Sequence, residues 1–144
     1  MNDFTISKTV FIKAPADAVW RFLTERDKLA AWFHEGEQDF KSKGIWAVLS
    51  DSAERQGERI CWGEILEYTP TTRLVHTFTH SYLNEVETRC EWLLTEVDGG
   101  TVLKLTHTGF EKVENGFDMA ADHDEGWDEH FARLRKLPGQ EKTG

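Results

Sequence analysis

A long series of strand-like segments ends in one helix-sized segment, Met119 to Leu137, and this order constrains the fold most strongly. At about 100° per residue, its apolar and aromatic side chains share one arc and its charged side chains occupy the opposite arc. The segment therefore predicts an amphipathic helix that needs a large apolar face to cover. The apolar arc holds Ala120, His123, Trp127, His130, Phe131, Leu134 and Leu137, and the charged arc holds Asp122, Glu125, Glu129, Arg133 and Lys136.

A glycine, Gly126, precedes Trp127 near the middle of this helix. Glycine inside a helix costs about 1 kcal/mol relative to alanine. We therefore expect another backbone or a bulky side chain to approach the helix closely at this position, as happens when a helix lies on a sheet.

The rest of the chain reads as one strand, two short helices and about six further strands. Alternating β-branched residues predict a strand over Thr5–Lys13, while Pro15 and Asp27 are suited to helix starts. This order is typical of an α+β domain in which a curved antiparallel sheet of six or seven strands wraps around the long C-terminal helix. The helices are expected over 15–24 and 27–33, the later strands over 36–40, 44–50, 58–69, 72–80, 86–97 and 101–110, a loop over 51–57 and a tail over 138–144.

Length and charge indicate a single acidic domain spanning residues 1–144. The net charge of −9, without any basic run, argues against nucleic acid and anionic membrane surfaces as partners. The N-terminus lacks a signal-peptide pattern and no segment is apolar enough for a membrane span, which predicts a cytoplasmic protein. Cys61 and Cys90 lack metal-binding spacing, so we expect reduced thiols in the core.

Several short motifs occur in an order that is informative as a set. They are Ala14-Pro15-Ala16-Asp17-Ala18-Val19-Trp20, Trp32-Phe33, Gly63 to Pro70 with Arg73-Leu74-Val75 after it, Gly100 to Phe110, and Gly126-Trp127. In the order and spacing of these motifs, residues 5–137 resemble the single-domain homologues of the heat-shock-protein-90 ATPase activator. Those proteins belong to the START-like (SRPBCC) superfamily. The resemblance implies the helix-grip fold. That superfamily includes lipid carriers, ligand receptors, cyclases and cochaperone domains, so the fold alone does not decide the function.

Strand periodicity indicates which side chains face the interior. Alternate residues of a strand point to opposite faces, so the bulkier alternating set is expected to face the core. The inward sets are Val86, Thr88, Cys90, Trp92 and Leu94; Leu103, Leu105 and His107; and Leu74, His76, Phe78 and His80.

Five of the six histidines fall on this predicted interior, and only His34 lies elsewhere. An apolar core has little use for so many groups that need hydrogen-bond partners. We therefore expect a partly polar cavity between the sheet and the terminal helix, with the helix as one wall. The candidate ligand-binding residues are His76, Phe78, His80, Cys90, Trp92, His107, His123, Trp127, His130 and Phe131.

No metal or cofactor is predicted. His123 and His130 are about 10 Å apart along a helix axis, which is too far for one ion without a bridging ligand. His76 and His80 are about 13 Å apart along a strand. The sequence shows no Ser-His-Asp order, nucleophile elbow, inward carboxylate pair or phosphate loop, so no catalytic residue is assigned.

Three functions stay open on the sequence. The favoured one is a binding module for a small amphipathic, aromatic or lipid-like ligand. The resemblance implies a second, a protein-interaction module that modulates a chaperone ATPase. The third is an enzyme of the cyclase, dehydratase or hydrolase kind that uses cavity histidines such as His107 and His130. Whether the outer face of the sheet pairs with a second copy to form a homodimer is also open.

Overall fold

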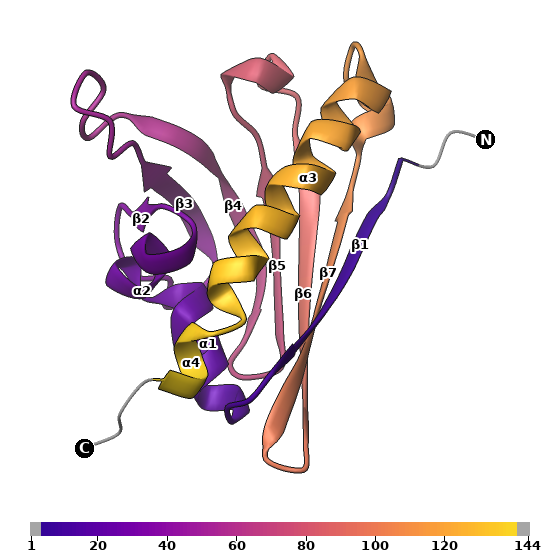
Figure 1. The fold of residues 1–144 in the computed structure, drawn as a ribbon. Helices are drawn as coiled ribbons and strands as arrows, with labels where there is room; N and C mark the ends of the chain where they lie inside the picture. Colours follow the sequence, from indigo (N-terminus) through magenta and orange to yellow (C-terminus); the bar gives the residue numbers. More distant parts are fainter. Residues whose placement is uncertain (1–3, 141–144) are drawn as a thin grey trace.

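The computed structural model describes residues 4–140 as one twisted sheet with helices against one face (Figure 1). The elements are β1 (Ile6–Ile12), α1 (Ala16–Thr24), α2 (Arg26–Trp32), β2 (Glu35–Gly36), β3 (Gly44–Leu49), β4 (Arg59–Thr69), β5 (Arg73–Phe78), η1 (Ser81–Leu83), β6 (Thr88–Val97), β7 (Gly100–Thr108), η2 (Phe110–Lys112), α3 (Gly116–Leu134) and α4 (Leu137–Gln140).

The sheet has seven strands in the order β1-β7-β6-β5-β4-β3-β2, and every pairing is antiparallel. The first strand pairs with the last one, so β1 closes a meander of hairpins. Figure 1 shows α3 running across the face of the sheet, with α1 and α2 beside its C-terminal half. The predicted α+β helix-grip fold is therefore confirmed.

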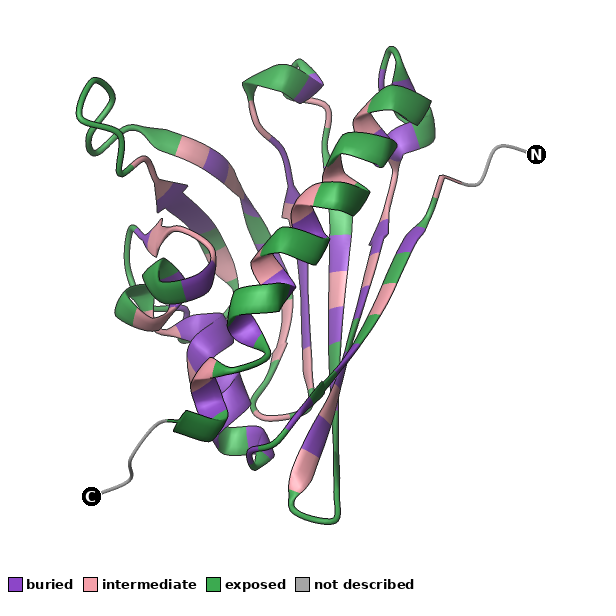
Figure 2. Ribbon diagram, viewed as in Figure 1, coloured by how far each residue is buried: buried purple, intermediate pink, exposed green. Residues whose placement is uncertain are grey.

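The core lies between the sheet and the helices, and burial alternates along the strands (Figure 2). Cys90, Leu105 and Leu103 are fully enclosed, and their strand neighbours point outward. Cys90 is the register partner of His107 on β7 and of His76 on β5. The predicted inward faces of β6 and β7 are confirmed. His76, Cys90 and His107 therefore lie side by side on three adjacent strands.

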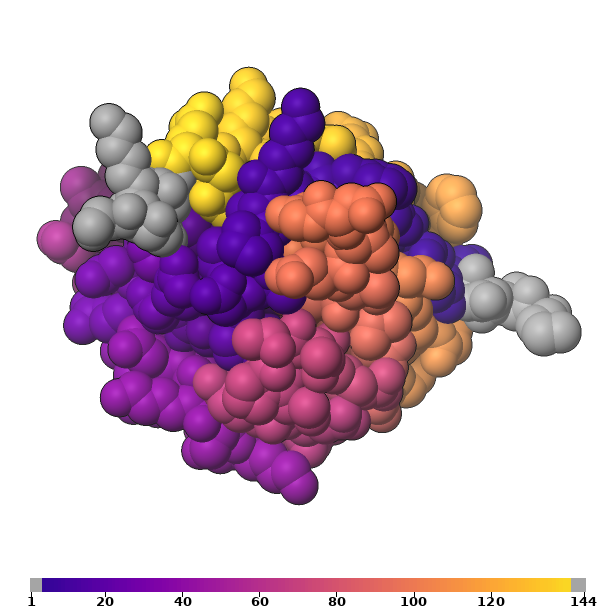
Figure 3. Space-filling model, turned by 90° about the horizontal axis from the view of Figure 1, so that it is seen from below, coloured from indigo at the N-terminus to yellow at the C-terminus, as the bar shows by residue number. Residues whose placement is uncertain are grey.

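Two long-range hydrogen bonds join the start of α1 to the hairpin of β6 and β7. Pro15 occupies the N-cap position of α1 without a side-chain hydrogen bond, and Glu96 of β6 substitutes for it, accepting from the Ala16 N–H at 2.6 Å. The Thr101 hydroxyl donates to the Ala14 carbonyl at 2.8 Å. Seen from below, indigo α1, the salmon hairpin of β6 and β7, and the yellow C-terminal helical end lie side by side (Figure 3).

The expected strand over 36–40 is wrong, because only the two residues of β2 pair with β3. The Phe40 N–H donates to the Thr24 carbonyl at 2.7 Å. The Asp39 carboxylate accepts from the Arg26 N–H at 2.8 Å. These two bonds hold the segment against the helices and draw it away from the sheet edge.

Helix ends also differ from the sequence expectation. The terminal helix begins at Gly116, three residues before Met119, and the expected tail contains α4, while residues 141–144 lie outside the described part. Asp27 lies in the first turn of α2, and Glu25 takes its N-cap position. No helix within the described chain is long and apolar enough to span a membrane.

The expected close approach at Gly126 is wrong. A Cβ added there would meet no heavy atom within 4 Å. Gly63 shows what such a contact looks like, because a Cβ there would lie 2.3 Å from the Thr77 carbonyl oxygen of β5. Packing therefore explains the glycine at position 63 and does not explain the one in the helix.

We expect Gly126→Ala to raise the free energy of unfolding by about 1 kcal/mol, because alanine is the better helix former and meets no neighbour. Gly63→Ala should instead lower it by about 1–3 kcal/mol, because β4 and β5 must separate to admit the methyl group. Urea denaturation followed by tryptophan fluorescence measures both. A loss of stability in Gly126→Ala would show that the helix is contacted there after all.

Candidate functional site

His107 is the centre of a hydrogen-bond chain that joins α3 to three strands. The indole N–H of Trp127 donates to His107 Nδ1 at 3.1 Å. His107 Nε2 lies 2.7 Å from Thr88 Oγ1, and this hydroxyl donates to the Phe78 carbonyl at 2.7 Å. Because an indole N–H only donates, Nδ1 accepts and Nε2 carries the proton. Both nitrogens are occupied, so His107 has no capacity left for a ligand.

Both ring nitrogens of His76 are also occupied by hydrogen bonds within the protein. The Trp92 indole N–H donates to His76 Nε2 at 2.9 Å, so the ring proton sits on Nδ1 and donates to the Thr77 carbonyl at 2.8 Å. The same carbonyl accepts from the Trp46 indole N–H at 2.9 Å. His76 therefore holds Trp92 by a hydrogen bond and shares the Thr77 carbonyl with Trp46, so it serves the packing of the core.

His80 and His123 form a pair that is held by ring stacking and by a hydrogen bond between the two rings. Their rings stack at 5.0 Å with an interplanar angle of 10°, and their Nε2 atoms are 2.8 Å apart. The Tyr82 N–H donates to His80 Nδ1 at 3.2 Å, so the proton of His80 is on Nε2 and points to His123. His123 Nδ1 donates to the Met119 carbonyl at 2.7 Å. All four ring nitrogens of the pair are thus occupied.

His130 and His34 differ from these four because they keep free nitrogens. Arg133 Nη2 lies 2.8 Å from His130 Nδ1, and since a guanidinium only donates, Nδ1 accepts and Nε2 carries the proton. The Trp32 carbonyl, 3.1 Å from the same Nδ1, accepts from Arg133 Nε at 3.2 Å. His130 Nε2 and both nitrogens of His34 have no hydrogen-bond partner among residues 4–140. The two rings meet edge to face at 5.7 Å.

Burial keeps the histidines neutral at physiological pH. Removal of the ring from water disfavours the charged form, so the pKa of each of the six falls below its ordinary value of 6.5. Loss of hydration lowers the pKa to about 4 for His76, His80 and His130, and lowers the pKa of His34, His107 and His123 as well.

One pocket of about 190 Å³ opens where α3 passes the segment after α2 and the ends of β4 and β5. The expectation that His34 lies apart from the other histidines is wrong, since it joins His80, His123 and His130 in this wall. The complete lining is Phe33, His34, Cys61, Phe78, His80, Asp122, His123, Gly126, Trp127 and His130. We call this the histidine pocket.

The interior behind the histidine pocket is filled. A void of about 20 Å³ lies there, and His76 and Trp92 contribute to its lining. That is space for about one water molecule. Cys90, His107 and Phe131 are buried in the packed core and line neither hollow. The structure thus brings five of the ten expected residues into the pocket, namely Phe78, His80, His123, Trp127 and His130.

Five lining residues were not among the candidates from the sequence. Phe33 and His34 follow α2 in an irregular segment where no periodicity reports which way a side chain points. Asp122 belongs to the charged arc of α3, at the edge of the pocket mouth. The one available signal was Gly126, whose missing side chain leaves open space beside the pocket. Cys61 completes the set.

The tautomers of the histidine pair oppose metal binding. Because His80 carries its proton on Nε2, the pair presents one lone pair and one N–H to the space between the rings, while an ion needs two lone pairs. Within residues 4–140, no three His, Cys, Asp or Glu side chains are grouped so that they could hold a metal ion.

The two cysteines are free and buried, as expected from the sequence. Burial raises the pKa of the Cys61 thiol to about 12 and raises that of Cys90 well above its ordinary value. The nucleophile in cysteine chemistry is the thiolate, which is scarce at such a pKa. Cys61 therefore acts as an apolar part of the pocket wall.

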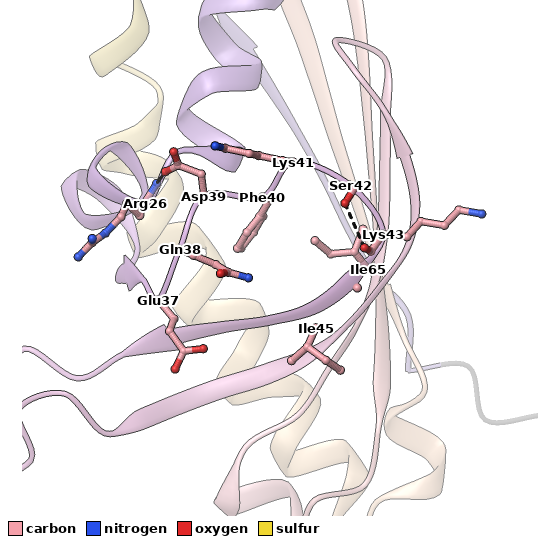
Figure 4. Close-up of a pocket in the computed structure, with 11 residues that line it drawn as sticks. Arg26, Glu37, Gln38, Asp39, Phe40, Lys41, Ser42, Lys43, Ile45 and Ile65 are labelled. Atoms are coloured by element: carbon pink, nitrogen blue, oxygen red, sulfur yellow. Dashed lines mark hydrogen bonds between the residues drawn. The ribbon is translucent and has the colours of Figure 1, made fainter.

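A larger hollow, of about 440 Å³, lies on another part of the surface beside the loop between β2 and β3 (Figure 4). The Phe40 ring points into it, whereas the Lys43 ammonium points away. Polar side chains form most of its wall, and Glu37 is already held by two hydrogen bonds from Arg59, at 2.7 and 2.8 Å. We place the candidate site in the smaller histidine pocket, where half-buried ring nitrogens are free.

We expect the free energy of unfolding to fall as the pH drops from about 6.5 to about 4. In this window the unfolded chain binds protons on histidines that stay neutral in the native state, so acid favours unfolding. His76→Gln removes one such group and should reduce the slope between pH 6 and pH 5 by about 1 kcal/mol per pH unit. Urea denaturation at pH 7, 6 and 5 measures this. An unchanged slope would mean that His76 takes up its proton in the folded protein.

Comparison with curated proteins finds no significant match. Among similar solved structures, DynU16, from the dynemicin biosynthetic locus, has a TM-score of 0.75 and 19% identity, over 93% of this chain and 46% of DynU16. This chain thus spans less than half of DynU16. PFC0360w, an Hsp90 activator from Plasmodium falciparum, has a TM-score of 0.59 and 22% identity over 72% of this chain and 71% of its own. The Aha1 dimer from Colwellia psychrerythraea has a TM-score of 0.74 and 15% identity over 95% and 98%.

These likenesses concern the fold, because each identity is below 25%. Membership rests on the family comparison, in which the model of the activator of Hsp90 ATPase homolog 1-like proteins matches residues 13–139. The match covers nearly the whole domain, from the end of β1 to α4. The chain belongs to the family of activator of Hsp90 ATPase homolog 1-like proteins.

Proposed function

We propose that this protein is a small-molecule binding module whose ligand occupies the histidine pocket. The observation that carries the proposal is the contrast between the six histidines. Four of them have both ring nitrogens occupied by the protein, while His34 and His130 keep free nitrogens in the wall of an open pocket. Half-buried polar groups without a protein partner are the anchors that a ligand uses for orientation.

The size of the pocket limits the ligand. Pockets for drug-sized ligands hold about 300–1,000 Å³, and the histidine pocket has about 190 Å³. The packed interior behind it leaves no space for an acyl chain. These volumes favour a compact compound of one or two rings and disfavour the lipid-like ligand that the sequence left open.

The apolar part of the wall favours a flat ligand. Phe33 stacks on Trp127 with ring centroids 5.6 Å apart and an interplanar angle of 21°. Phe78 lies 6.2 Å from the same indole. These rings supply dispersion contacts and faces suited to aromatic stacking. A planar compound with one or two hydrogen-bonding groups matches both the rings and the free imidazole nitrogens.

A screen of one-ring and two-ring compounds by native mass spectrometry and thermal shift tests the proposal. We expect binders whose affinity falls at least tenfold in Gly126→Leu, because residues 122, 123, 126 and 130 share one face of α3 and the new side chain would enter the pocket. Gly126→Ala is the matched control, with the same backbone change and little lost volume. Binders that Gly126→Leu leaves unaffected, or an absence of binders, would contradict the proposal.

Family membership favours a second candidate, a domain that modulates a chaperone ATPase. If this chain has that activity, adding it to an Hsp90 from the same organism should change the rate of ATP hydrolysis, and the two proteins should co-elute. An unchanged rate and no complex would remove the candidate. A catalytic use of His107 has less support than either function, because both of its nitrogens are committed to the core.

A further inference from the structure

We infer that the ligand of the histidine pocket is a cation, a compact aromatic compound that carries a protonated amine. The inference rests on the proposed function and adds the chemical class of the ligand. Three properties of the wall support it: its formal charge, its aromatic rings and the free lone pair of His34.

The formal charge of the wall is negative. Asp122 is the only lining residue with a formal charge, since the lining histidines are held neutral by burial. Its carboxylate raises the pKa of His123 against the effect of burial, and Asp51 acts on His34 in the same sense. The Arg133 guanidinium, outside the lining, acts in the opposite sense and lowers the pKa of His34 and of His130. With a net charge of −9 on the chain, an approaching cation is attracted and an anion is repelled.

The aromatic rings of the pocket wall also favour a positively charged ligand. Trp127, Phe33 and Phe78 line the pocket together, and the indole is within 5.6 and 6.2 Å of the two phenyl rings. The face of an aromatic ring is the negative part of its quadrupole, so it attracts an ammonium group, and tryptophan does so most strongly. Trp127 and Phe78 are only 4% and 3% exposed, so half-buried Phe33 offers a ring-bearing amine the most accessible face in this wall.

Among the lining residues, the lone pair of His34 is the one free ring-nitrogen acceptor that suits an ammonium group, because His130 Nε2 carries a proton and donates. An ammonium group only donates hydrogen bonds, and the neutral ring of His34 offers a lone pair without a partner among residues 4–140. The nearest guanidinium, that of Arg133, is outside the lining and is committed to His130 Nδ1 and the Trp32 carbonyl. A carboxylate or phosphate in this pocket would therefore find no cationic side chain among the lining residues.

Three probes with one ring system and different charges test the inference: tryptamine as the cation, tryptophol as the neutral compound and indole-3-acetate as the anion. Titration calorimetry at pH 7.5 and low salt should give the order tryptamine, tryptophol, indole-3-acetate in decreasing affinity. Asp122→Asn should weaken tryptamine roughly two- to fivefold, the range of a solvent-exposed ion pair, and leave tryptophol unchanged. Glu111→Gln, the same charge change on the exposed surface of η2, should affect neither.

The outcomes distinguish a failure of the cationic ligand class from a failure of the proposed binding function. If tryptophol or indole-3-acetate binds as tightly as tryptamine, and Gly126→Leu abolishes that binding, the pocket is a ligand site and the cationic class is overturned. If tryptamine binds but Asp122→Asn and Glu111→Gln weaken it equally, the attraction comes from the net charge and the assigned role of the pocket carboxylate fails. If no probe and no compound of the wider screen binds, the proposed function fails together with the inference.

Discussion

The hydrogen-bond chain from Trp127 through His107 and Thr88 to the Phe78 carbonyl is the interaction on which the rest of the structure depends. It joins α3 to β7, β6 and β5 in turn, and each donor in it meets one acceptor. A buried imidazole or indole without a hydrogen-bond partner would destabilise the folded protein by about 1–3 kcal/mol. The hydrogen-bond chain therefore fixes one position of the helix against the sheet. Apolar contacts alone would specify that position less closely.

The same requirement divides the histidines by role. Where a ring is fully enclosed, as for His76 and His107, the protein supplies partners for both nitrogens. Toward the pocket mouth the pair of His80 and His123 still satisfies itself, and at the mouth His34 keeps both nitrogens free. Polar satisfaction by the protein thus decreases toward the opening, which is the pattern expected where a ligand completes the network.

Much of this arrangement could be predicted from periodicity, and the limits of that prediction are physical. The two-residue repeat of strands placed Cys90, Trp92 and His107 inside correctly, because it depends only on the pleat. It did not predict whether the space between sheet and helix is filled, since that depends on the summed volumes and rotamers of side chains from distant segments. His34 was misplaced because the segment after α2 has no repeat, and its direction is set by tertiary contacts.

Gly126 connects stability and function in this molecule. The expected reason for a helix glycine, close packing, is absent, because its missing side chain faces open space. Alanine would give a more stable helix by about 1 kcal/mol. The residues one turn to either side, Asp122 and His130, both line the pocket, so a larger side chain here would project between them. The glycine therefore fits a helix in which some stability is given up to keep a wall of the pocket open.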